Sequence, residues 1–154
     1  MSKIASASLP SGAKRVGIEQ VSVAEKNGFR RPFNVNGSNN IFRLPHMLIS
    51  FQDYELQNNE KIDLEQIRER LLGEVEEIKS RGTKDEVKLV TVNGTKYMIH
   101  KMYYGEDCTT SFISEQKGKN GLKGQLLFKK QNSTEAEKVL NEFLNGIKFF
   151  NIND

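Results

Sequence analysis

Residues 62–82 read IDLEQIRERLLGEVEEIKSRG, and this stretch carries the clearest structural signal in the chain. Its apolar side chains recur every three to four residues, which is the spacing of one face of an α-helix. They are Leu64, Ile67, Leu71, Leu72, Val75 and Ile78. Most charged residues of the stretch fall off this stripe. We therefore expect one long helix that packs on one side of a sheet, with the rest of the chain organised around it.

Both ends of this helix have recognisable signals. Asp63 is the predicted N-cap, because its carboxylate can accept hydrogen bonds from the free N–H groups of the first turn. Gln66 lies three residues further on and completes a capping box. Gly82 is a typical residue to end the helix.

The strongest β signal follows this helix. Val87–Val92 and Thr95–Tyr104 flank Asn93-Gly94, a pair that favours a two-residue hairpin turn because both residues tolerate positive φ. A two-residue loop sets the register of the two strands. It places Val90 opposite Tyr97, and Leu89 opposite Met98.

The other elements have weaker patterns. Short apolar runs predict strands at residues 41–44, 47–54, 109–115 and 125–130. A second amphipathic helix is expected from Thr134, which would form a capping box with Glu137, and its apolar stripe runs to Ile147. The hydrophobic residues 148–150 follow as a short strand or a packed tail. Residues 1–40 read as a loosely ordered lead-in, with one weak strand signal at residues 14–24.

Together these elements predict an α+β fold, in which an antiparallel sheet of about five to seven strands carries two amphipathic helices. The chain of 154 residues fits a single domain over residues 41–154. Its 36% apolar and 28% charged content is ordinary for a globular protein, and a net charge of +3 does not demand a nucleic acid or a membrane. A single cysteine excludes an intrachain disulfide framework. No secretion signal opens the sequence, so we expect a cytoplasmic protein unless such a signal has been removed.

The order of the elements over residues 41–150 resembles the PsbP-like family. The resemblance rests on that order, on Val-Asn-Gly-Thr-Lys-Tyr at residues 92–97, and on Glu-Ala-Glu-Lys-Val-Leu-Asn-Glu-Phe-Leu-Asn-Gly-Ile-Lys-Phe at residues 135–149. The same fold is used by a photosystem II extrinsic subunit, a Ran-binding nuclear import factor and small bacterial secreted, lipoprotein or immunity-type proteins. The resemblance implies a non-catalytic partner of other proteins, and it transfers no binding residue.

The residues themselves offer little for catalysis. Cys108 follows Glu106-Asp107, and carboxylates beside a thiol raise its pKa rather than activate it. His46 and His100 lie in a strand break and in the middle of a hairpin, so a Cys–His pair is not expected. Two histidines without further ligands at metal-binding spacing do not make a zinc site. We therefore expect a protein that is not an enzyme and that holds no cofactor or metal.

The candidate binding residues are basic. Lys117, Lys119 and Lys123 lie in and beside a Lys/Gly/Asn loop, and Lys129-Lys130 follows. They are interpreted as a solvated loop or as a surface for an acidic protein partner. A nucleic-acid-binding surface is the weaker interpretation, because the nearby aromatic residues occupy strand positions that are expected to be buried in the core.

The leading hypothesis is a non-enzymatic protein-binding module that caps, inhibits or adapts a partner, as immunity and adaptor proteins do. The alternative is a carrier or sensor with an apolar pocket between helix and sheet, under residues 67–78. An uncharacterised hydrolase is the third candidate, since a single sequence can hide dispersed sites.

Overall fold

A computed structural model describes residues 2–16, 29, 40–79 and 85–150, with side chains omitted at residues 75 and 77–79. Its elements are β1 (Ala5–Ser6), β2 (Lys14–Arg15), β3 (Asn40–Leu44), β4 (Met47–Glu55), α2 (Leu64–Lys79), β5 (Glu86–Val92), β6 (Thr95–Tyr104), β7 (Asp107–Ser114), β8 (Asn120–Lys129), a 3₁₀ turn (Lys130–Asn132), α3 (Ser133–Asn145) and β9 (Lys148–Phe149).

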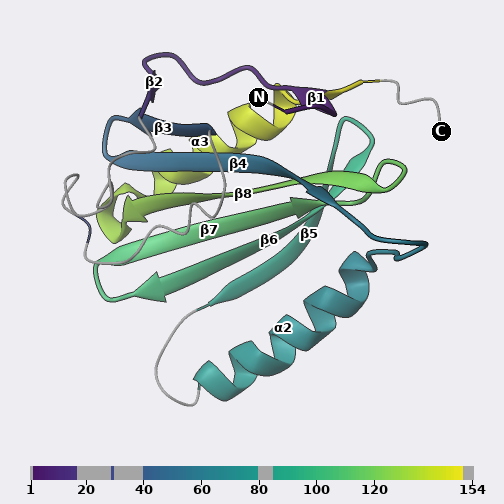
Figure 1. The fold of residues 1–154 in the computed structure, drawn as a ribbon. Helices are drawn as coiled ribbons and strands as arrows, with labels where there is room; N and C mark the ends of the chain where they lie inside the picture. Colours follow the sequence, from purple (N-terminus) through teal and green to yellow (C-terminus); the bar gives the residue numbers. More distant parts are fainter. Residues whose placement is uncertain (1, 17–28, 30–39, 80–84, 151–154) are drawn as a thin grey trace.

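Seven strands form one antiparallel sheet in the order β2-β3-β4-β8-β7-β6-β5. Strand β1 pairs separately with β9. Figure 1 shows α3 on one side of the large sheet and α2 on the other. The predicted α+β class, strand number and two helices are confirmed.

The hairpin of β5 and β6 follows its sequence signal closely. Asn93 and Gly94 have φ values of 50° and 78°, which is the left-handed backbone that a two-residue turn of this kind requires. Val90 pairs with Tyr97, and the Leu89–Met98 pair lies next to it, so the predicted register is confirmed.

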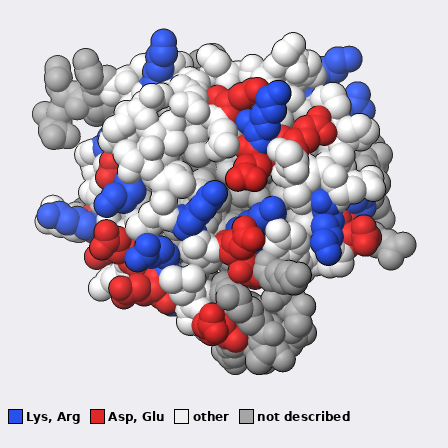
Figure 2. All heavy atoms as spheres, turned by 180° about the vertical axis from the view of Figure 1, so that it is seen from behind, with Lys and Arg blue, Asp and Glu red and all other residues white. Residues whose placement is uncertain are grey.

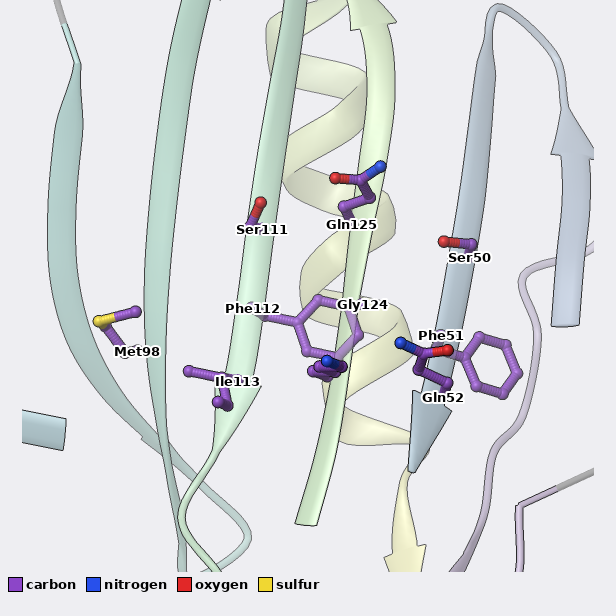
Figure 3. Close-up of a pocket in the computed structure, with 10 residues that line it drawn as sticks. Ser50, Phe51, Gln52, Met98, Ser111, Phe112, Ile113, Gly124 and Gln125 are labelled. Atoms are coloured by element: carbon purple, nitrogen blue, oxygen red, sulfur yellow. The ribbon is translucent and has the colours of Figure 1, made fainter. Parts of the chain in front are cut away.

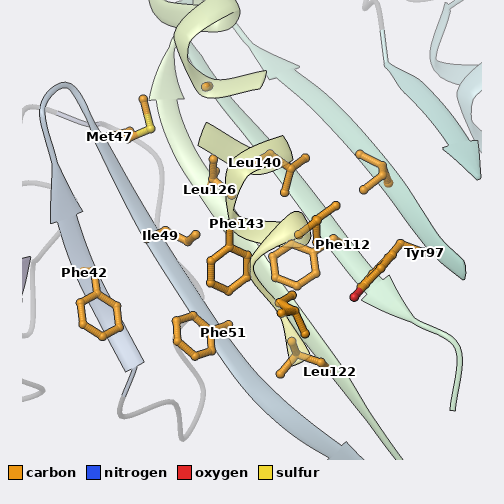
Figure 4. Packing of buried hydrophobic residues seen from close by; sticks show 14 of the residues in the cluster. Phe42, Met47, Ile49, Phe51, Tyr97, Phe112, Leu122, Leu126, Leu140 and Phe143 are labelled. Atoms are coloured by element: carbon orange, nitrogen blue, oxygen red, sulfur yellow. The ribbon is translucent and has the colours of Figure 1, made fainter. Parts of the chain in front are cut away.

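The main hydrophobic core lies between α3 and the sheet (Figure 4). Phe143 of α3 is completely buried, with its ring centroid 5.0 Å from that of Phe51 on β4 and 5.6 Å from that of Phe112 on β7. The buried residues of this helix are Ala136, Leu140, Phe143 and Leu144. This helix therefore holds the centre of the fold.

Helix α2 covers only the β5–β6 end of the opposite face (Figure 1). Its predicted start is confirmed, because Asp63 Oδ1 accepts hydrogen bonds from the N–H groups of Glu65 and Gln66 at 3.1 and 3.2 Å. Of its described apolar side chains only Leu64 is buried, while Leu72 is 40% exposed. The prediction that the chain is organised around this helix is wrong, because α2 lies over an edge of the sheet. Gly82 lies outside the described residues.

The start of α3 also differs from its prediction. The proposed capping box of Thr134 and Glu137 is wrong: the helix begins at Ser133, and the N-cap Asn132 makes no side-chain cap hydrogen bond. The chain enters α3 through the 3₁₀ turn, and Ser133 Oγ donates to the carbonyl oxygen of Lys130 at 2.7 Å. This bond ties the start of α3 to the 3₁₀ turn, but it does not replace a cap, because it satisfies a carbonyl oxygen and not the free N–H groups of the first turn.

The described part of the lead-in contributes to the core. Ile4 and Ala5 are buried in the main cluster, where β1 pairs with β9. Of the weak strand signal at residues 14–24, only β2 falls within the described residues, and it adds an edge strand beside β3. The tail is a short strand, β9, as one of the two alternatives predicted. The domain boundary at residue 40 stays a prediction.

Candidate functional site

The face of the sheet opposite α3 has a hollow at its centre (Figure 3). Helix α2 covers this face at the β5–β6 end, and a small apolar cluster of Phe29, Ile41, Leu48 and Leu127 packs on it at the other end. Between them lies a hollow of about 290 Å³. The described residues that line it are Ser50, Phe51, Gln52, Met98, Ser111, Phe112, Ile113, Lys123, Gly124 and Gln125.

Strand alternation places the polar side chains in this hollow. Along β4, β8 and β7, every second residue enters the α3 core, and the residues between them point to the opposite face. The register aligns these outward residues in two rows. One row joins Ser50, Gln125 and Ser111; the next joins Gln52, Lys123 and Ile113. The hollow therefore combines amide and hydroxyl groups with one cation and an apolar end.

Lys123 is the charged group of this hollow. Its side chain is exposed, and it forms no ion pair with any residue in the described ranges. An exposed cation at the rim of a hollow is suited to an acidic group on a binding partner.

The other two predicted binding residues are engaged within the chain. Lys117 Nζ lies 3.5 Å from Glu115 Oε1 and 5.5 Å from the ring centroid of Phe149. Lys119 Nζ lies 2.9 Å from Glu55 Oε1, and its hydrogen bond lowers the pKa of Glu55. Only Lys123 of the three lines the hollow. The role of all three in partner binding stays a prediction.

The residues considered for catalysis are not brought together. Cys108 is completely buried in the α3 core, and burial raises the pKa of its thiol. His100 lies on the other face of the sheet, and His46 is exposed at the β3–β4 turn. Asp107 pairs with Lys129. Among the described residues, no group of three metal-ligating side chains could hold an ion.

His100 is a partly buried titratable group near α2. Its Nε2 atom lies 3.8 Å from Asp85 Oδ2 and makes no hydrogen bond. Burial lowers the pKa of His100, and the Asp85 and Glu74 carboxylates offset part of that effect. The neutral ring is therefore favoured in the folded protein more than in the unfolded chain.

Mild acid is expected to destabilise the fold through His100. Its folded pKa lies below the value of about 6.5 in an unfolded chain, so the unfolded state takes up the proton first as the pH falls. Well above about pH 6.5, His100 is neutral in both the folded and the unfolded state, so it no longer makes the free energy of unfolding depend on pH. Denaturant unfolding at about pH 7.5 and about pH 5.5 should show a larger loss of stability for wild type than for His100→Gln. Equal losses in the two proteins would refute this role.

Sequence reasoning missed the polar lining of the hollow. Ser50, Gln52 and Gln125 lie within or beside apolar strand runs, where polar residues are usually interpreted as a solvated face. The available signal was the pair Ser50 and Gln52 at alternating positions of β4, together with one such polar residue on each of two other strands, Ser111 and Gln125. It becomes a site only when the strand order brings those strands side by side.

No family model matches the sequence, and none of the curated proteins matches it either. A search of solved structures does find a match, the solution structure of cyanobacterial PsbP (CyanoP) from Synechocystis sp. PCC 6803. The two chains superpose with a TM-score of 0.55 at 10% sequence identity, over 96% of this chain and 93% of that one. The fold is PsbP-like. The predicted resemblance is thus confirmed at the level of the fold, and at this identity the PsbP-like match carries no binding residue across.

Within the described ranges, none of the helices has the length and apolar character needed to cross a membrane.

Proposed function

We propose that this protein is a non-enzymatic binding module that caps, inhibits or adapts a protein partner, in the manner of an immunity or adaptor protein. The observation that carries the proposal is the hollow opposite α3, where Lys123 stands beside a mixed polar and apolar surface. Such a surface suits a partner that inserts a side chain and offers an acidic group at the rim.

The position of the hollow supports a protein partner over an apolar ligand. A carrier of the predicted kind would hold its ligand between α2 and the sheet, under residues 67–78, but none of the described residues that line this hollow belongs to α2. The hollow is lined by sheet residues, and its volume of about 290 Å³ is just below the usual volume of ligand pockets, roughly 300–1,000 Å³. The second candidate is a small polar ligand bound in this hollow, in place of the apolar ligand expected from the sequence.

A charge reversal at Lys123 tests the proposal. The tagged protein should capture one stoichiometric, salt-sensitive partner from a lysate of its own source, identified by mass spectrometry. Lys123→Glu is expected to reduce capture at least about tenfold, because it places like charges together at the rim. Lys117→Glu and Lys119→Glu should have smaller effects, since each residue already pairs with a carboxylate of the chain.

Lys138→Glu is the matched control. Lys138 is exposed on α3, on the opposite side of the sheet, where basic and acidic side chains are interspersed (Figure 2). Equal capture by the Lys123 and Lys138 variants would contradict the proposed surface. Capture of no protein, with a small molecule released on denaturation, would favour the second candidate.

A further inference from the structure

A second hollow, at the β2–β3 end of the sheet, is bordered by three basic side chains. Lys14 of β2, Arg43 of β3 and His46 of the β3–β4 turn line a space of about 520 Å³. Phe29 and Pro45 contribute apolar surface to it. No acidic residue is among its described lining.

Two of these basic side chains lie directly opposite each other. Lys14 and Arg43 are partners in the β2–β3 register, so their side chains leave the sheet on the same face. Like charges placed opposite each other on neighbouring strands destabilise a sheet. A bound anion between them would reverse this effect, because each cation would then gain a counter-charge.

Within the described residues, Lys14 and Arg43 differ from other lysines of the chain in their ion pairing. Lys117, Lys119 and Lys129 each pair with a carboxylate of the chain. Lys14 and Arg43, in contrast, form no ion pair with any described residue. Their charge is therefore available to a ligand.

Two turns frame the hollow. His46 has a φ of 64°, a left-handed conformation that is uncommon outside glycine, and it directly follows Pro45. Gly12 has a φ of 87° in the turn that leads into β2. His46 lines the hollow, so its ring can offer an N–H donor to a ligand there.

We propose that this hollow is a binding site for a phosphate group, taken either as free phosphate or as part of a small organic phosphate. The Arg43 guanidinium can donate two parallel hydrogen bonds to phosphate oxygens, and Lys14 adds a point charge. The space exceeds what a single phosphate fills, which leaves room for an organic body against Pro45. The site is separate from the Lys123 hollow and does not depend on the proposed function.

Calorimetric titration of the full chain at low salt tests the site with three probes: inorganic phosphate, adenosine 5′-monophosphate and adenosine. Both phosphate-bearing probes should bind, and adenosine should not. Tighter binding of the monophosphate than of inorganic phosphate would identify an organic phosphate as the ligand, whereas equal affinity would identify free phosphate. Failure of both phosphate-bearing probes to bind would overturn the proposal.

Variants locate the binding. Arg43→Gln should weaken phosphate binding roughly tenfold or more, and Arg43→Lys should fall between it and wild type because charge is kept while the paired hydrogen bonds are lost. Lys138→Gln should leave binding unchanged. Without phosphate, Arg43→Gln should melt no lower than wild type, since it removes a like-charge contact. Wild-type affinity in Arg43→Gln would overturn the site.

Discussion

Phe143→Ala is expected to lower the free energy of unfolding by about 3–5 kcal/mol. The side chain is completely buried, and its ring packs against Phe51 and Phe112 from two central strands. Alanine would leave a cavity at the point where α3 joins the sheet. Urea or guanidinium unfolding, followed by circular dichroism, measures the loss.

Leu71→Ala is the comparison for this variant. Leu71 lies on α2 and is only half-buried, so its truncation should cost clearly less than that of Phe143. If the two variants lost equal stability, α2 would be as central to the fold as α3, against the packing described above.

Gly124→Ala is expected to cost roughly 1–3 kcal/mol or more, although it adds a single methyl group. A Cβ atom at Gly124 would lie 2.4 Å from the carbonyl oxygen of Ser50 and 2.5 Å from the ring of Phe112. The first of these atoms belongs to the backbone of β4 and cannot rotate away. Strands β4 and β8 would have to separate at the centre of the sheet.

The same substitution at Gly73 is the control. Gly73 lies within α2, and a Cβ atom there meets nothing within 4 Å. Gly73→Ala should therefore raise the free energy of unfolding by roughly 0.5–1 kcal/mol through helix propensity. Thermal or denaturant unfolding of the two variants should give shifts of opposite sign. A neutral result for Gly124→Ala would contradict the close strand packing.

Local patterns predicted the elements well. The Asn93-Gly94 turn determined the β5–β6 register, because a two-residue loop leaves no freedom in pairing. Asp63 determined the start of α2 through short-range hydrogen bonds. In both cases the decisive contact lies within a few residues of the signal.

Periodicity could not decide which helix holds the core. The stripes of α2 and α3 look equally regular in sequence, but α3 packs on the sheet centre whereas α2 packs near the β5 edge. The pairing of β1 with β9, which buries Ile4, joins the two ends of the chain. Such long-range contacts leave no local pattern.

In the candidate site, too, the sequence predicted local features but not the contacts between distant strands. The sequence identified the basic residues around the β7–β8 loop, but it could not show that Lys119 pairs with Glu55 at the end of the neighbouring strand β4. Nor could it show that Lys14 lies opposite Arg43, since β2 and β3 are separated along the chain. Strand order decides whether a cation pairs with a carboxylate of the same chain or can bind a ligand, and a single sequence does not reveal strand order.

Site-specific photocrosslinking tests whether the partner binds the sheet face opposite α3. A benzoylphenylalanine placed at Gln52, beside Lys123 in the register, would be irradiated in lysate and compared with the same group at Lys138 on α3. The captured partner should crosslink from position 52 and not from position 138. Crosslinking only from position 138, or equally from both, would contradict binding at this face.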